Sequence, residues 1–140
     1  MNINRQNGFS LIELLLVVVM IGVIATIGIP NFIRGIAAAE HGSMNATLKV
    51  ILGSQTAFYG ANGRYARLDE LNSVHHDSLG QMTGNQLVRG KFTYEMIPAA
   101  PTDAELKDGF RIKVSRPVGL NGPPFVLEFT EVGFSTQLFP

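Results

Sequence analysis

Glu13 is the residue near the start of the chain whose type and position indicate a specific chemistry. It lies four residues after Phe9 and is the only charge in the 21-residue segment from Phe9 to Ile29. A charge near the centre of a bilayer costs about 2.5–3.5 kcal/mol on insertion scales, and less near the interface. In a medium of low dielectric constant, opposite charges attract strongly and a charge left alone is costly. We therefore predict that Glu13 pairs with a positive charge.

Two other groups of polar residues suggest chemistry, but neither has a specific spacing. His75, His76 and Asp77 are adjacent, so on a strand or a helix their side chains diverge and would not converge on one ion. We interpret them as part of a solvated loop, with a surface ion or a partner contact as the alternative. A second, acidic group in a predicted loop could hold calcium loosely, and its members are Asp103, Glu105 and Asp108.

Motifs typical of enzymes are missing from the sequence. It contains no nucleophile elbow, no phosphate-binding loop and no paired-cysteine motif. We therefore expect neither an enzyme nor a resident metal or cofactor.

The segment that carries Glu13 has the length of a membrane span. At about 1.5 Å per residue its helix would extend roughly 32 Å, close to the thickness of the hydrocarbon layer. Leu14–Ile21 is apolar on every side, which indicates lipid or equally apolar neighbours around it. Met1–Gly8 looks like the start of a signal peptide, but no A-x-A site follows the apolar run, and the small residue placed for cleavage is Gly8.

The leader and the apolar segment together resemble the prepilin family, which comprises type IV pilins and the pseudopilins of type II secretion and DNA-uptake systems. The residues that carry the resemblance are Gly8, Phe9, Ser10, Leu11-Ile12-Glu13-Leu14, Gly22 and Ile29-Pro30-Asn31-Phe32. The resemblance implies that a membrane prepilin peptidase/methyltransferase cuts between Gly8 and Phe9 and methylates the new N-terminus at Phe9. It also implies that Glu13 pairs with the N-terminal ammonium of a neighbouring subunit during assembly.

The same resemblance implies partners and a location. The precursor would cross the bacterial inner membrane once with its head outside the cytoplasm, and an assembly platform would then add copies to a homopolymer. The product would be a surface pilus or, as the nearer alternative, a periplasmic pseudopilus. A single-span, membrane-anchored binding domain or enzyme is the more distant alternative.

The overall composition limits other functions. The chain has 140 residues, enough for one domain, and a formal net charge of zero. Removal of Met1–Gly8, whose one charged side chain is Arg5, leaves 132 residues with a formal net charge of −1. This charge gives no electrostatic footprint for nucleic acid, and two short basic pairs, Arg64 with Arg67 and Arg89 with Lys91, are interpreted as solvated surface. Cysteine is absent, so no disulfide can hold the C-terminal loop.

The apolar pattern predicts one long helix from about residue 9 to about residue 61. After residue 30 an amphipathic stripe with a period near 3.6 begins, and Asn62-Gly63 is a good stop signal. Pro30 and Gly22 should kink or loosen this helix. We therefore divide the chain into a leader (1–8), a hydrophobic transmembrane and assembly half of the helix (9–30) and a globular head (31–140).

The head should also contain a small antiparallel sheet. Period-2 alternation predicts strands at 91–97, 110–115 and 125–129, and a weaker one at 133–138. Thr102 and Glu105 have the spacing of a capping box, and residues 72–90 are predicted to be irregular. The expected fold is α+β: a long N-terminal helix packed against an antiparallel sheet of three to four strands, as in pilins.

Overall fold

The computed structural model describes residues 9–116 and 125–137. The leader, including Gly8, lies outside the described residues, as does most of the Gly- and Pro-rich connection after Arg116. The chain divides into two compact units, residues 1–38 and 39–140, which are treated separately below.

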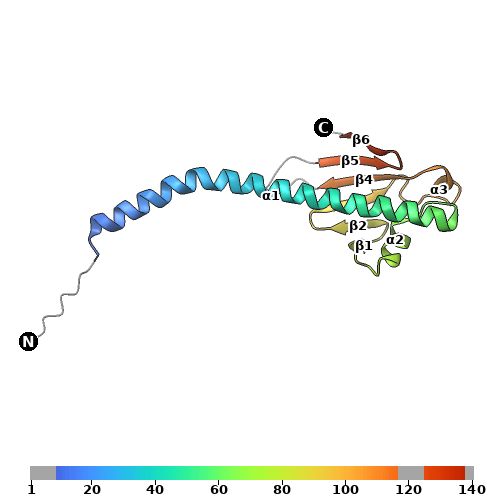
Figure 1. Ribbon diagram of the computed structural model, residues 1–140, viewed down its shortest axis with the longest axis horizontal. Helices are drawn as coiled ribbons and strands as arrows, with labels where there is room; N and C mark the ends of the chain where they lie inside the picture. Colours follow the sequence, from blue (N-terminus) through green and yellow to red (C-terminus); the bar gives the residue numbers. More distant parts are fainter. Residues whose placement is uncertain (1–8, 117–124, 138–140) are drawn as a thin grey trace, which may run out of the picture. The chain divides into compact units, whose positions relative to one another are not determined.

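A single helix, α1, runs from Leu11 to Asn62 (Figure 1). Its bounds confirm the predicted helix within two residues. Pro30 lies inside α1, and residues on both sides of it are helical; the kink at Pro30 and Gly22 stays a prediction. The helix ends at Gly63, whose φ of 69° lies in the left-handed region that glycine adopts easily.

The head contains an antiparallel sheet whose six strands follow one another in chain order, from β1 to β6, in the described part of the chain. Their bounds are β1 Gln81–Thr83, β2 Gln86–Arg89, β3 Phe92–Met96, β4 Arg111–Arg116, β5 Phe125–Thr130 and β6 Gly133–Gln137. The α+β class and all four predicted strands are confirmed.

The prediction of an irregular segment at 72–90 was wrong, because β1 and β2 lie within it. Both strands are bounded by two-residue turns, Gly84-Asn85 and Gly90-Lys91, and each glycine has a φ of 61°. A glycine at positive φ in the first turn position is a hairpin signal. The strands themselves are short and partly polar, so they lack a clear period of two.

Two short helices connect these elements. Helix α2 spans Leu68–Val74 and helix α3 spans Glu105–Asp108. The predicted capping box is confirmed: the Thr102 N–H donates to the Glu105 carboxylate at 2.7 Å, and the Glu105 N–H donates to the Thr102 hydroxyl at 3.3 Å.

The core of the head lies between one face of α1 and one face of the sheet. From α1 it receives Met44, Leu48 and Ile51, which lie three or four residues apart as the helical period requires. From the sheet it receives alternate residues, such as Ile112 and Val114 in β4. Apolar residues at helical spacing on α1 and alternate apolar residues of the strands therefore pack together in one layer.

Two buried amides hold the chain that connects α1 to the sheet. The Gln55 side chain both donates to and accepts from the backbone of Ala66, at 2.8 Å each. The Asn72 side chain donates to the Gly80 carbonyl and accepts from the Leu79 N–H, both at 3.2 Å. A buried amide with both of its polar atoms paired adds specificity without a desolvation penalty.

A series of aromatic contacts joins the end of α1 to the sheet. The ring centroids of Tyr59 and Tyr65 are 4.7 Å apart, those of Tyr65 and Phe110 are 5.0 Å apart, and those of Phe110 and Phe129 are 6.0 Å apart. These distances are typical of stabilising aromatic pairs.

Gly80→Ala should destabilise the head, because a Cβ at this position would lie 2.6 Å from the Val88 carbonyl oxygen. Gly42→Ala is the matched control: its Cβ would meet nothing, and in a helix interior alanine is favoured by about 1 kcal/mol. Thermal unfolding of the full chain in detergent should show a lower midpoint for the first variant and an equal or higher one for the second. Equal midpoints for both would contradict the close approach of β2 to Gly80.

Candidate functional site

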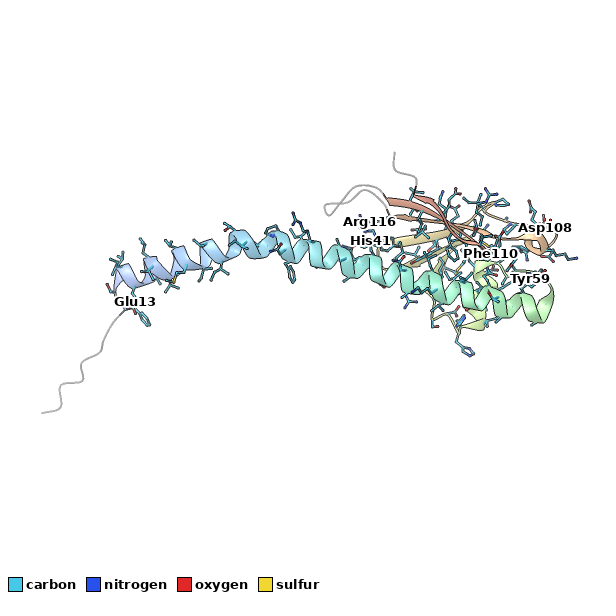
Figure 2. All side chains as sticks on the ribbon, turned by 45° about the horizontal axis from the view of Figure 1, so that its top comes forward. Glu13, His41, Tyr59, Asp108, Phe110 and Arg116 are labelled. Atoms are coloured by element: carbon cyan, nitrogen blue, oxygen red, sulfur yellow. The ribbon has the colours of Figure 1, made fainter. Side chains whose placement is uncertain are left out.

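The candidate assembly segment, Phe9–Ile29, begins with an exposed end. Phe9 is 88% exposed and Leu11 is 81% exposed. The Ser10 carbonyl accepts the Glu13 N–H at 3.0 Å and the Leu14 N–H at 3.2 Å, so the first turn of α1 starts at Ser10. Figure 2 shows Glu13 at this end of the helix.

Glu13 lies in the first turn of α1, where a carboxylate interacts favourably with the positive end of the helix dipole. Among the described residues no cation forms an ion pair with Glu13. Phe9 precedes α1 by two residues and Glu13 lies in its first turn, so the start of the assembly segment carries both a large apolar residue and a carboxylate without an ion pair among the described residues.

The rest of the assembly segment is uncovered. Its large apolar side chains are between 46% exposed, at Val17, and 81% exposed, at Leu11. Within the described residues α1 is the one helix long and apolar enough to cross a membrane, and none of that apolar stretch is buried. Lipid or other protein chains must therefore cover it, because apolar surface is driven out of water.

His75, His76 and Asp77 lie in a turn that follows α2. His75 follows the last residue of α2, and its Nε2 lies 2.5 Å from the Ser54 hydroxyl. Asp77 accepts a hydrogen bond from the Asn72 amide at 3.1 Å, and both His76 and Asp77 have positive φ values. His75 and Asp77 therefore have separate partners rather than a shared one.

The acidic group in the predicted loop is also divided. Asp103 pairs with Arg67 at 2.5 Å, Glu105 accepts from Thr102, and Asp108 is exposed. No group of three or more potential metal ligands comes together among the residues that the structure describes.

An ionic network stabilises the segment between α1 and α2. Its members are Arg64, Glu70, Arg67 and Asp103. The Arg64 guanidinium donates to both carboxylate oxygens of Glu70, at 2.6 and 2.9 Å, and the Arg67 N–H donates to Glu70 at 2.8 Å. These bonds, above all those from Arg64, lower the pKa of Glu70 to about 2.

A second ionic group joins α1 to the sheet. Glu40 pairs with Lys91 at 2.5 Å and with Arg116 at 3.6 Å. Arg89 donates to the Leu79 carbonyl at 3.1 Å. Both basic pairs were predicted to be solvated. Arg89 and Lys91 are exposed, as predicted, although each also binds a residue of the head, whereas Arg64 and Arg67 are partly buried in the ionic network.

Sequence reasoning missed the roles of Glu70 and Glu40. Glu70 had a local signal, since it lies three residues after Arg67, the N-cap of α2, and its carboxylate accepts the Arg67 N–H. Glu40 had none, because its partners lie more than 50 residues away in the chain.

Comparisons with known proteins agree with the N-terminal features. Residues 3–29 match the family model described as the prokaryotic N-terminal methylation motif. Over 62 residues the chain is 40% identical to the type IV major pilin protein PilA of Myxococcus xanthus (strain DK1622). This similarity covers 44% of the chain and 28% of the relative, so the chain matches less than a third of that protein's length. No solved structure matches the chain significantly.

A long apolar N-terminal helix followed by an antiparallel sheet defines an α+β protein with a pilin-like fold. The methylation motif and the identity to a pilin are similarities over part of the chain, and they agree with the resemblance to type IV pilins. The resemblance inferred from the first 32 residues is thus confirmed.

The ionic network should make the head sensitive to acid. The folded-state pKa of Glu70 lies below the ordinary value of 4.5, so its stabilisation is complete above about pH 5 and is lost as the pH falls toward 2. Glu70→Gln should lower stability at pH 7 by about 1–2 kcal/mol, since a partly exposed pair is screened, and should flatten the acid dependence. Thermal unfolding at pH 7 and pH 3 measures both effects. Asp69→Asn, an exposed neighbour, is the control, and an identical acid profile for Glu70→Gln would contradict this role.

Proposed function

We propose that the chain is a structural, non-enzymatic subunit of a type IV pilus filament. It is cleaved after Gly8, N-methylated at Phe9 and polymerised through the first half of α1. The observation that carries this proposal is the uncovered assembly segment with Glu13 as its one carboxylate. A segment of this kind needs both apolar cover and a cation, and a filament of like subunits supplies both.

In the proposed filament, cleavage creates an ammonium at Phe9. A methylated amine keeps its positive charge, so it remains a partner for a carboxylate. Glu13 of one copy pairs with the Phe9 ammonium of its neighbour, and this pair fixes the register between them, since either charge alone in an apolar environment is costly. The apolar side chains of neighbouring copies pack together, and because the contact is heterologous the assembly stays open-ended.

Before assembly, the proposed precursor spans the inner membrane once through α1, with the head outside the cytoplasm. Its further partners are a prepilin peptidase/methyltransferase and a pilus assembly platform. The identity to a major pilin favours a pilus over a type II secretion or DNA-uptake pseudopilus, which would use the same N-terminal chemistry.

The proposed function is tested by the mass of the N-terminal peptide from sheared surface material of the producing cells. A peptide that starts at methylated Phe9 in this fraction is the expected result. A processed chain found only in the membrane fraction would favour a pseudopilin. A chain that still carries Met1 in the membrane would contradict processing and favour a plain membrane anchor.

Glu13→Ala should leave membrane insertion intact and strongly reduce incorporation into filaments, because the ammonium of the neighbour loses its partner. The measurement is the ratio of sheared to membrane-bound protein on immunoblots. Asp69→Ala, which removes an exposed carboxylate of α2, is the control and should leave the ratio unchanged. A normal filament yield from Glu13→Ala would refute the charge pairing.

Gly8→Val should block cleavage, because the bulkier side chain occupies the position next to the bond that is cut. The expected product is the full-length precursor in the membrane fraction, heavier than the processed chain by the mass of Met1–Gly8. Asn2→Val, in the same leader, should be processed normally. Intact-mass measurement distinguishes the two, and a shortened Gly8→Val chain would place the cleavage elsewhere.

A further inference from the structure

The turn between β5 and β6 presents an exposed apolar side chain. Thr130 and Gly133 are paired across this turn, so Glu131 and Val132 form its two-residue tip. Val132 is 90% exposed, the largest exposed fraction among the large apolar side chains that the structure describes. An isolated valine on the tip of a hairpin is well placed to insert into a hollow on another surface.

The head also carries an apolar groove between α1 and α2, with a volume of about 500 Å³. Its floor is formed by small residues one helical turn apart, Gly53, Ala57 and Ala61, and its walls include Phe58 and Val74. Val74 is itself 60% exposed.

The space beside the glycine in this floor is open in the described part of the head. A Cβ at Gly53 would meet no atom within 4 Å. Glycine inside a helix is disfavoured by about 1 kcal/mol relative to alanine. The groove therefore has the shape of a site that another chain approaches closely.

The valine tip and the groove belong to different sides of the head. The tip joins β5 and β6, at one edge of the sheet, whereas α2 contacts β2, next to the other edge. Figure 1 shows α2 beside β1 and β2, away from β5 and β6. A contact between the two surfaces thus suits two adjacent copies, each of which offers one tip and one groove.

Charges next to the two surfaces are complementary. Glu131 accepts a hydrogen bond from the Phe110 N–H at 3.4 Å, and no cation forms an ion pair with it in the described part of the head. Lys49 lies one turn before Gly53, is exposed, and likewise has no ion pair within residues 9–116 and 125–137. A carboxylate beside the apolar tip can therefore meet an ammonium beside the apolar groove.

We propose that Val132 of one head inserts into the groove of a neighbouring copy, with its Glu131 beside the neighbour's Lys49. The occupant of the groove is a second copy of this chain, and the contact is heterologous and open-ended. This inference rests on the proposed function, because the filament brings the heads side by side.

Cysteine cross-linking tests the contact directly, since the chain has no cysteine of its own. Filaments of a chain carrying both Val132→Cys and Ala57→Cys should, on mild oxidation, give a ladder of dimers, trimers and larger multimers. Each single variant should stay monomeric, and filaments mixed from the two single variants should give dimers alone. Filaments without a ladder would overturn the contact and leave the proposed function standing. Absence of filaments from the wild-type chain would overturn both.

Charge reversal gives an independent test if the double cysteine variant does not assemble. Lys49→Glu should lower the filament yield about tenfold, equivalent to ~1.4 kcal/mol, and Glu131→Lys should do the same. The chain with both changes should recover, because the pair is restored with its signs exchanged. The control is the thermal unfolding midpoint of each variant, which should equal that of the wild-type chain. A double variant as poor as the single ones would refute the pairing of Glu131 with Lys49.

Discussion

The rest of this structure depends on one constraint: the first half of α1 is apolar on every side, and none of the described residues covers it. Burying apolar surface is worth roughly 25 cal/mol per Å², so a helix with this much exposed apolar area cannot remain in water. Lipid satisfies the constraint for a precursor, and identical helices satisfy it for the proposed filament. Glu13 makes the two solutions different, because the hydrocarbon chains of lipid offer no counter-charge and, in the proposed filament, a neighbouring N-terminus does.

The second half of the same helix is covered on one face by the sheet. Here one face, marked by Leu48 and Ile51, is fully buried against the sheet, and the opposite face remains open. One continuous helix thus provides both the uncovered segment and the base of the head. The two roles are separated along the chain, since the compact units divide after Ala38 and the first buried residue of α1 is Met44.

The head holds its connections without a disulfide. Gln55 binds Ala66, and Glu40 binds Lys91 and Arg116, so polar contacts at two places join α1 to the segments that follow it. Within those segments Glu70 binds Arg64. The ion pairs among these contacts depend on protonation, whereas a disulfide would not. They leave Val132, at the tip of the β5–β6 turn, exposed, and this is where contacts between heads can form.

The sequence by itself determined the elements whose signal is local. The extent of α1 follows from its apolar pattern and the stop at Gly63, and the strands β3 to β6 follow from alternation. The role proposed for the N-terminal segment rests on Gly8, Phe9 and Glu13. Only the tertiary structure decided how distant residues meet: Glu40 with Lys91, the groove between α1 and α2, and the short strands β1 and β2. These depend on contacts across many residues of chain, and neither helical nor strand periodicity carries information about which distant residues will be neighbours.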